Sequence, residues 1–477
     1  MNDKQNYIEV TPSISLIHAN QKVLQRVDKA LSFKKTIWIR QYGKVRPKIV
    51  QESYFYKKKE MTDKGMKFSY YFFSGFLPRV LKIFPKIKII KKQFYIPVKK
   101  KPKLYNIQFR DYQKQAFRKA FFKRNGIIHH PTGTGKGIIL LGLASGIIGN
   151  VLILCHSIDI VKQIYNDALK DRLEDPFLLA GGEKELNHRH KLVIASINTF
   201  KNRISEHDYN FYDAVIVDEC HRISNTYAKV LSKINAPIRI GLTATVPTSQ
   251  DRKMLIEGLI GKVIDTLTPK QAANKKILSI AHVKIIPLKQ HIFSKAYKST
   301  TKNYTSIYAA NIVHNRARNE LIVKSAMELN KKDKSCLILV KNIRHGENIQ
   351  RIFKENGQNI HFMQGSSKSN TRILAKENLS QKGIKTLIAT VIFLTGVNIP
   401  SLDCIIFALG DKSEIRTIQA VGRCLRKTTT KEKALIIDFL DQGKYINNHS
   451  KNRIRTYKKQ GFEVEIVKDI ENSGMIF

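Results

Sequence analysis

A loop of small residues constrains the fold more than any other stretch of the sequence. Residues 126–137 read GIIHHPTGTGKG, where a short apolar run leads into a Gly-rich loop that ends at Gly135-Lys136-Gly137, and a second apolar run follows to residue 148. In a strand, loop and helix of this kind, backbone N–H groups and a helix N-terminus face one point, where phosphate groups bind. The sequence therefore predicts an α/β fold with a nucleoside triphosphate held at this loop.

Two neighbouring carboxylates strengthen this prediction. Asp218 and Glu219 directly follow the apolar run 214–217, and Asp218 stands 82 positions after Lys136. At the carboxyl end of a strand, one carboxylate can hold Mg²⁺ while the next polarises the attacking water. The alternative, a pair of ordinary surface acids, is disfavoured by the ordered spacing. We therefore predict that Asp218 binds the metal and that Glu219 acts on the water.

One position departs from the usual phosphate loop. Such loops normally carry Ser or Thr after the lysine, because its hydroxyl coordinates Mg²⁺. This chain has Gly137 there, and His130 stands where a small residue usually opens the loop. The metal would then depend on Asp218, phosphate oxygens and water. A nucleic-acid-binding clamp that binds ATP but turns it over poorly therefore stays open as an alternative to an active enzyme.

The charge of the chain points to a polyanionic partner. Among 477 residues, 84 Lys and Arg stand against 38 Asp and Glu, which gives a net charge of +46. The first 103 residues hold 25 of the basic and 6 of the acidic residues. Nucleic acid is the partner that this balance favours. The alternative is a coding bias that raises the Lys content without a functional reason.

Cysteine usage and apolar runs bear on the compartment. The chain shows no C-x-x-C spacing, and most of its cysteines lie in or beside apolar runs, which indicates free thiols in a reducing compartment. The five cysteines are Cys155, Cys220, Cys336, Cys404 and Cys424. The first residues lack the build of a signal peptide, and the apolar run 137–148 is shorter than the roughly 20 residues that span a membrane. We therefore expect a soluble, monomeric, cytoplasmic protein without membrane contact.

The N-terminal 103 residues predict a small basic domain and a linker. A helix is expected over 16–31, followed by strands over 36–42, 49–56 and 67–73 and a helix over 76–84. This α-β-β-β-α order is that of the double-stranded-RNA-binding fold, which reads duplex shape and backbone. The alternative is an unrelated α+β domain that caps its neighbour. Residues 86–103, rich in Lys and Pro, are expected to form a solvated linker.

From residue 105 onward, short β-branched runs alternate with amphipathic segments, as expected for parallel sheets with crossover helices. In the first series, strands are expected at 126–128, 151–155, 192–195, 214–217 and 238–242. The second series begins near residue 280, with strands at 336–340, 360–363, 386–389, 404–408 and 434–437. We therefore predict two related lobes, at 104–272 and 273–447, and a basic tail at 448–477 without an assigned role.

With the loop and the carboxylates, further motifs occur in an order that resembles the superfamily 2 helicases and translocases over about residues 107–440. They are FRDYQ at 109–113, PTGTGKG at 131–137, DECH at 218–221, GLTAT at 241–245, LVK at 339–341, QG at 364–365, TGVNIP at 395–400 and QAVGRCLR at 419–426. The resemblance implies two RecA-like parallel-sheet lobes in tandem after the small basic α+β domain, with ATP and Mg²⁺ as cofactors.

The resemblance also implies roles for single residues. The catalytic set would be Lys136, Asp218 and Glu219, with Arg423 and Arg426 as arginine fingers from the second lobe. ATP would contact Gln113 through its base, and also Thr132, Gly133, Thr134, Gly135, Lys136, Gly137, Gly396 and Asn398. The nucleic-acid track would include Thr199, Gln364, Gly365 and Thr390, although Thr199, Gln364 and Thr390 could also be ordinary polar loop residues. Four further residues would couple the state of the bound nucleotide to the strength of nucleic-acid binding. They are His221, Thr243, Thr245 and Gln419.

Within the superfamily, the DECH box, the GLTAT segment and the QAVGRCLR segment resemble the XPB and UvsW group, including its virus- and phage-encoded members, more than the DEAD-box RNA enzymes. The resemblance implies an ATP-dependent DNA helicase that unwinds or remodels branched DNA in recombination, repair or replication. An RNA helicase is the first alternative, because these motifs mainly contact the nucleic-acid backbone.

Overall fold

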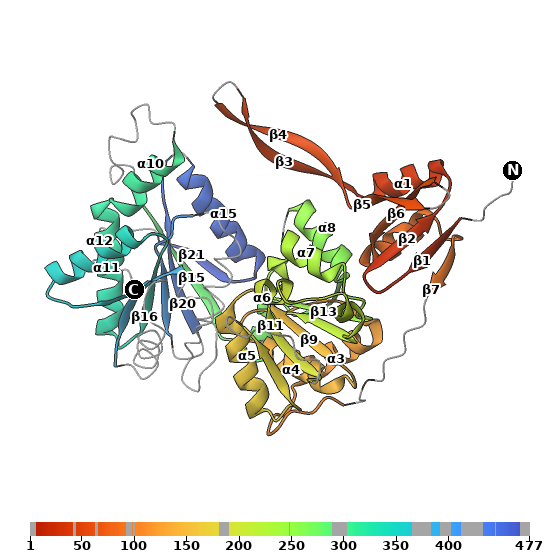
Figure 1. Cartoon of the computed structure of the whole chain (residues 1–477). Helices are drawn as coiled ribbons and strands as arrows, with labels where there is room; N and C mark the ends of the chain where they lie inside the picture. Colours follow the sequence, from red (N-terminus) through yellow and green to blue (C-terminus); the bar gives the residue numbers. More distant parts are fainter. Residues whose placement is uncertain are drawn as a thin grey trace. The chain divides into compact units, whose positions relative to one another are not determined.

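The computed structural model describes most of the chain. The chain divides into two compact units, which we treat separately (Figure 1). The first unit holds residues 1–130 and 135–266, and the second holds residues 131–134 and 267–477. The described residues are 6–41, 44–62, 65–91, 98, 101–180, 190–247, 249–288, 303–364, 383–391, 402–411, 433–443 and 445–467.

The N-terminal part of the first unit is a small mixed α+β domain. Its elements are β1 (Tyr7–Val10), β2 (Ile14–His18), α1 (Gln21–Leu31), β3 (Ser32–Gln41), β4 (Lys44–Ser53), β5 (Phe55–Thr62), β6 (Gly65–Phe73), η1 (Ser74–Phe76), α2 (Leu77–Ile83) and β7 (Lys88–Lys91). Five strands form one sheet in the order β5-β6-β2-β1-β7, while β3 and β4 form a separate antiparallel ribbon.

The expected α-β-β-β-α order is wrong. Two strands precede α1, and the helix begins at Gln21 because the Asn20 side chain caps it by accepting a hydrogen bond from the Val23 N–H at 3.0 Å. Residues 14–18 alternate between partly and fully buried side chains, which is the period of a strand. The apolar residues that suggested a helix from 16 onward therefore belong to two different elements.

This domain packs directly on the first α/β lobe. The rings of Phe73 and Phe76 lie so close to Gly258 that a Cβ atom there would come within 3.0 Å of both, and Arg79 pairs with Glu257 at 2.8 Å. Buried side chains of the domain and of the lobe form one continuous apolar cluster. The two parts therefore share a core, so deletion of the domain would expose apolar surface on the lobe.

The first lobe is a seven-stranded parallel sheet with helices on both faces. Its elements are α3 (Asp111–Lys123), β8 (Asn125–His129), α4 (Lys136–Gly146), β9 (Val151–Cys155), α5 (Ile158–Lys170), β10 (Pro176–Leu179), β11 (Leu192–Ser196), α6 (Ile197–Lys201), η2 (His207–Asn210), β12 (Ala214–Val217), η3 (Cys220–Arg222), α7 (Asn225–Leu231), β13 (Ile238–Thr243), α8 (Gln250–Leu259) and β14 (Val263–Thr266). The strand order is β10-β11-β9-β12-β13-β8-β14. Helices α3, α4 and α5 pack on one face, and α6, α7 and α8 pack on the other.

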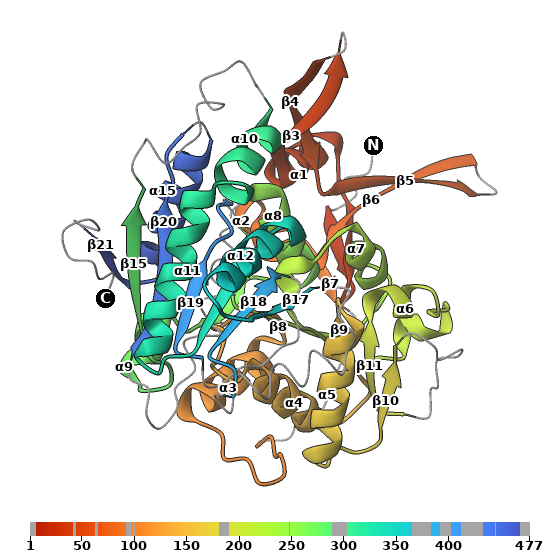
Figure 2. The ribbon, with the colours of Figure 1, turned by 90° about the vertical axis from the view of Figure 1, so that its left-hand side faces the viewer.

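The second lobe has the same architecture. Its elements are α9 (Pro269–Asn274), β15 (Ile280–Pro287), α10 (Tyr304–Tyr308), the π-helical turn η6 (Ala309–Val313), α11 (Arg316–Lys331), β16 (Cys336–Val340), α12 (Ile343–Glu355), β17 (His361–Met363), β18 (Thr386–Thr390), β19 (Cys404–Phe407), β20 (Lys433–Leu440), α15 (Ile446–Lys459) and β21 (Glu463–Ile466). The parallel strand order is β17-β18-β16-β19-β20-β15-β21, and α11 and α12 cover one face of the sheet (Figure 2).

Residues 448–467, which the sequence pattern places in a basic tail, instead form most of α15 and the edge strand β21 of this sheet. Helix α15 packs on the face opposite α11, where the Arg453 guanidinium lies 5.7 Å from the centre of the Phe407 ring. Because β21 pairs with β15 over four residues, this segment completes the second lobe.

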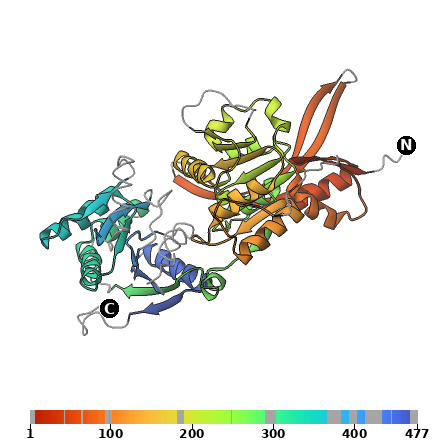
Figure 3. The ribbon, with the colours of Figure 1, turned by 90° about the horizontal axis from the view of Figure 1, so that it is seen from below.

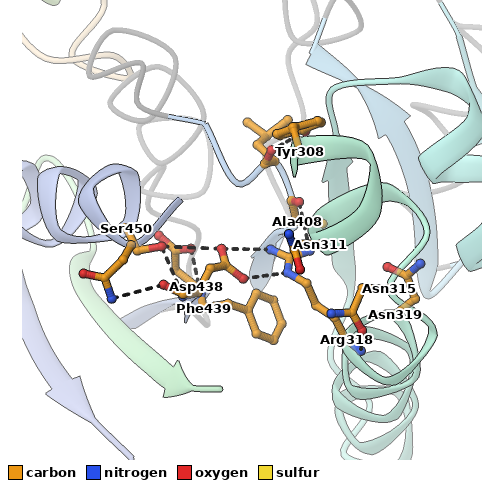
Figure 4. Close-up of polar contacts among 12 residues, drawn as sticks. Tyr308, Asn311, Asn315, Arg318, Asn319, Ala408, Asp438, Phe439 and Ser450 are labelled. Atoms are coloured by element: carbon orange, nitrogen blue, oxygen red, sulfur yellow. Dashed lines mark hydrogen bonds and ion pairs between the residues drawn. The ribbon is translucent and has the colours of Figure 1, made fainter. Parts of the chain in front are cut away.

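A buried charge network holds α15 and α11 to the sheet. Arg453 and Asp438 lie 2.8 Å apart, Arg318 and Asp441 also lie 2.8 Å apart, and the Tyr457 hydroxyl donates to Asp438 at 2.8 Å. All five side chains are buried. Burial lowers the pKa of the Arg453 guanidinium, but the negative charges of Asp438 and Asp441 outweigh it and raise that pKa. Figure 4 shows the part of the network around Arg318, Asp438 and Ser450.

Candidate functional site

The predicted phosphate loop connects β8 to α4. Gly133 and Gly135 have φ angles of 90° and 74°, in the left-handed region that favours glycine. Lys136 is the first residue of α4, and the Thr134 hydroxyl donates to the Pro131 carbonyl at 2.8 Å. A Cβ atom on Gly137 would meet no atom within 4 Å. The loop therefore has the backbone expected of an anion-binding turn at a helix N-terminus, with open space beside Gly137.

Gln113 lies beside this loop. Its Nε2 atom would come within 3.0 Å of a Cβ placed on Gly135, so glycine is needed there for space as well as for backbone angle. The Gln113 Oε1 atom accepts a hydrogen bond from the Arg110 backbone N–H at 2.9 Å, which caps α3. The side chain is buried. The structure thus brings Gln113 to the loop and leaves its Nε2 atom facing Gly135.

The two carboxylates follow β12, a central strand of the sheet. The Asp218 N–H donates to the Leu154 carbonyl of the neighbouring β9 at 3.0 Å, which fixes where the strand ends. Burial, and then the negative charge of Glu219, raise the pKa of Asp218. Burial also raises the pKa of Glu219, but contact with His221 and the charge of Lys136 outweigh it and lower that pKa. The lysine and both carboxylates therefore act on one another at one edge of the sheet.

Glu219 holds a strained backbone. Its φ of 47° and ψ of 51° place a residue with a Cβ atom in the left-handed region. Such a conformation costs roughly 1–3 kcal/mol and persists only where the surroundings impose it. The strain turns the chain sharply after Asp218, so that consecutive residues present their carboxylates on the same edge.

His221 links these carboxylates to the end of β13. Its Nδ1 atom lies 3.1 Å from Glu219 Oε2 and 3.0 Å from the Thr243 hydroxyl. The Thr243 hydroxyl donates to the Thr245 carbonyl at 2.7 Å, and both threonines are buried. The structure therefore brings together three of the four residues predicted to couple the state of the bound nucleotide to nucleic-acid binding.

The donor set is suited to Mg²⁺ only with ligands from outside the protein. Mg²⁺ commonly takes one or two carboxylates, with phosphate and water oxygens completing an octahedron. Asp218 supplies such a carboxylate and is partly exposed. In the described part of the chain, no three Asp, Glu, His or Cys side chains form a metal cluster. A nucleotide-borne Mg²⁺ fits this site, and Asp218 would hold it.

Three side chains at the loop were not predicted to be functional. His130 Nε2 lies 2.6 Å from Asp265 Oδ2, and Lys119 Nζ lies 2.7 Å from Asp265 Oδ1. His130 is fully buried. Burial raises the pKa of Asp265, but the hydrogen bonds from His130 and Lys119 outweigh it and lower that pKa. The imidazole that replaces the usual small residue therefore ties the loop to β14.

Three of the four predicted nucleic-acid contacts lie at carboxyl ends of strands. Thr199 lies in α6 directly after β11, and its hydroxyl lies 2.7 Å from that of Ser196, which caps the helix. In the second lobe, Gln364 follows β17 and Thr390 ends the adjacent β18. Thr390 is 5% exposed, and among the described residues its hydroxyl has no hydrogen-bond partner. Gln364 and Thr390 are thus brought to the same edge of the sheet.

Six predicted site residues lie outside the described residues. They are Gly365, Gly396, Asn398, Gln419, Arg423 and Arg426.

Comparisons with known proteins agree with this site. The family described as "Type III restriction enzyme, res subunit" matches residues 106–248, and the "Helicase conserved C-terminal domain" family matches residues 317–428. A protein of Sulfolobus islandicus filamentous virus (isolate Iceland/Hveragerdi) that is named as a helicase is 28% identical over 71% of this chain and 63% of its own length. The ATP-dependent DNA helicase UvsW of Enterobacteria phage T4 is 24% identical over 74% of this chain and 75% of its own.

Among solved structures, a fragment of an HsdR subunit of a type I restriction enzyme from Vibrio vulnificus YJ016 has the same fold. It aligns with a TM-score of 0.58 at 17% identity, over 77% of this chain and 69% of the fragment. No helix in the described ranges is both long and apolar enough to cross a membrane. The chain carries the two conserved domains of superfamily 2 helicases, and its relatives include members of the XPB and UvsW group.

Proposed function

We propose that this chain hydrolyses ATP at the 130–137 loop and uses the energy to unwind or remodel branched DNA. The observation that supports the proposal most directly is the meeting of Lys136, Asp218 and Glu219 at the carboxyl edge of the first sheet. Lys136 would bind the β and γ phosphates, Asp218 would hold the magnesium ion, and Glu219 would polarise the attacking water. Arg423 and Arg426 would stabilise the transferring phosphoryl group, so that hydrolysis requires the second lobe.

DNA is the proposed substrate because of the N-terminal domain and the relatives. The first 103 residues hold 25 basic and 6 acidic residues, and their domain shares a core with the ATP-binding lobe. A cationic surface rigidly joined to an ATPase lobe fits a duplex whose strands that lobe would separate. The phage relative is named as a DNA helicase. Four residues would contact the phosphates of one strand, so that binding depends little on base sequence. These residues are Thr199, Gln364, Gly365 and Thr390.

The test of the proposed function is a substrate panel on the full chain. ATPase activity and strand separation are measured with no nucleic acid, a plain duplex, a forked duplex, a four-way junction and an RNA fork of equal length. We expect ATPase activity to rise at least tenfold with forked DNA and to fall to background in Lys136→Ala. An ATPase rate that does not change when DNA is added, or that is unchanged in Lys136→Ala, contradicts the proposal. Preference for the RNA fork would identify an RNA helicase instead.

The missing hydroxyl at position 137 gives a separate prediction. A side chain fits there without contact, so Gly137→Thr is expected to fold normally and to add a ligand for Mg²⁺. We expect the Mg²⁺ concentration for half-maximal ATPase activity to fall severalfold relative to Gly137→Val, which has nearly the same shape but lacks the hydroxyl. A large rise in kcat for Gly137→Thr alone would show that the native loop limits turnover. Equal behaviour of the two variants would mean that the added hydroxyl does not reach the metal.

A further inference from the structure

The β3–β4 ribbon is an unusual feature of the N-terminal domain. Two antiparallel strands of ten residues each, paired from Ser32↔Ser53 to Gln41↔Lys44, leave the domain without joining its five-stranded sheet. Figures 1 and 3 show the ribbon extending beyond that sheet and the first lobe. A two-stranded ribbon is marginally stable on its own, because neither face is covered. Its length and exposure therefore call for a role outside the fold.

One face of the ribbon presents exposed apolar side chains. In an antiparallel pair, directly opposite residues present their side chains on the same face, and every second residue shares it. Trp38 pairs with Pro47 and Thr36 with Ile49, so these four side chains lie on one face. Trp38 and Ile49 are each 69% exposed. Exposed apolar side chains gathered in this way mark a binding surface more often than an inert one.

The ribbon is also strongly basic. Residues 32–53 include six basic side chains and a single acid. The basic residues are Lys34, Lys35, Arg40, Lys44, Arg46 and Lys48. The acid, Glu52, pairs with Lys35 at 3.2 Å near the base of the ribbon, so no acid of the ribbon itself is left to neutralise the others. The partner of this surface is therefore a polyanion that also offers flat apolar faces.

The base of the ribbon is fixed to the ATP-binding lobe. Phe33 is buried and stacks on Tyr54 with ring centres 4.7 Å apart. The Tyr54 hydroxyl donates to the Asp251 carbonyl of α8 at 3.1 Å. Helix α8 comes shortly after the Thr243–Thr245 segment, whose threonine hydroxyl contacts His221. Whatever the ribbon touches is therefore held at a set position relative to the ATPase lobe.

We propose that the β3–β4 ribbon is a nucleic-acid-binding arm that stacks Trp38 on a base exposed where duplex DNA meets single strands. At that position the strands are polyanionic through their phosphates, and their bases are open to stacking by an aromatic ring, which matches the cationic and apolar character of the ribbon. Lys34, exposed on the same face as Trp38, would contact phosphates of the strand that carries the stacked base. Arg46 and Lys48, exposed on the opposite face, would contact phosphates that pass the other side of the ribbon. The inference rests on the proposed function, because it assumes that the chain acts on DNA.

The chain's single tryptophan makes the test direct, because intrinsic tryptophan fluorescence reports on Trp38 alone. The full chain is titrated with a forked duplex, with a blunt duplex and with a single strand of the same sequence. We expect the fork to quench the emission most strongly and to protect it from acrylamide. Trp38→Ala is expected to weaken fork binding about 5- to 150-fold, since one stacked base contributes roughly 1–3 kcal/mol, and Trp38→Phe is expected to weaken it less.

The matched control is Phe122→Ala, because Phe122 is an aromatic side chain 81% exposed on α3, outside the ribbon. Its fork affinity should stay within twofold of the parent. Unchanged emission on adding the fork, together with unchanged affinity of Trp38→Ala, would overturn the inference. A change in sedimenting mass of Trp38→Ala without a change in fork affinity would also overturn it, in favour of pairing between two copies.

The outcome is distinguishable from failure of the proposed function. If forked DNA stimulates the parent ATPase but Trp38→Ala binds the fork as the parent does, only the arm is disproved. If forked DNA leaves the parent ATPase unchanged, the proposed function fails first.

Discussion

Replacing Glu219 with Gln is expected to lower kcat for ATP hydrolysis by roughly 10²- to 10⁴-fold, the usual contribution of a positioned acid or base. The contact with His221 and the charge of Lys136 lower the pKa of Glu219, so this side chain is a carboxylate at neutral pH and can polarise water. Gln keeps the size of the side chain but not the charge. The measurement is steady-state ATPase activity with saturating forked DNA.

ATP binding should survive this substitution. The negative charge of Glu219 helps to raise the pKa of Asp218, so its removal should lower that pKa and leave Asp218 better able to hold Mg²⁺. We therefore expect the Kd for a fluorescent ATP analogue to change less than about threefold, since the phosphate contacts are untouched. Glu206→Gln, at an exposed position in the same lobe, serves as the control. If kcat of Glu219→Gln stays within tenfold of the parent while ATP binds normally, another group must polarise the attacking water.

The central strands could be predicted from sequence because their signal is local. Strands such as Val151–Cys155 and Cys336–Val340 are buried at every residue, and a short apolar, β-branched run is typical of that environment. The sequence pattern did not predict three other strands, Pro176–Leu179, Val263–Thr266 and Glu463–Ile466. Each is an edge strand of its sheet that keeps exposed or partly exposed residues, so its sequence carries little apolar pattern. Pairing with the neighbouring strand decides its conformation.

The same distinction separates the predicted from the unpredicted site residues. Lys136, Asp218 and Glu219 each occur in a short contiguous motif, so their positions follow from the strand and loop that carry them. The contact between His130 and Asp265 joins positions 135 residues apart. It depends on β14 pairing with β8 at the edge of the sheet, which no local pattern reveals. The one sign in the sequence was a histidine at the position where a small residue usually opens the loop, and the sequence did not identify its partner.

The ribbon illustrates a further limit. Strand patterns over 36–42 and 49–56 predicted one β-strand each. The structure places β3 over most of the first range, but the second range divides between the end of β4 and the start of β5, which belongs to the main sheet. The sequence could not show that β3 and β4 leave the main sheet, because alternation of side chains is the same in a covered and an uncovered strand. Exposure of Trp38 became visible only with the fold.

The second large effect concerns stability. Arg453→Met is expected to destabilise the second lobe by about 3–5 kcal/mol, because it leaves buried negative charge without its partner. Arg453 makes paired contacts with Asp438, at 2.8 and 2.9 Å, and donates to the Asp411 carbonyl at 2.8 Å. Met replaces much of the volume but none of these interactions.

Hydrogen exchange of the full chain is the suitable measurement, since a protein of several domains does not unfold in one step. Amides of β20 and α15 should exchange a hundredfold faster or more in Arg453→Met, while amides of the first lobe keep their parent rates. Arg455→Met is the matched control, because Arg455 lies on the same helix but is exposed, and we expect a change within about 0.5 kcal/mol there.

A double variant separates loss of charge pairing from loss of packing. Arg453→Met combined with Asp438→Asn removes both charges, and the carbonyl of the substituted amide side chain can still accept from the Tyr457 hydroxyl, which donates to Asp438 in the parent at 2.8 Å. We expect the double variant to lose about 1–3 kcal/mol less than the sum of the two single variants, as for residues that interact directly. Additive losses would mean that Arg453 stabilises α15 by filling space, and that the buried ion pair contributes nothing to the position of β20.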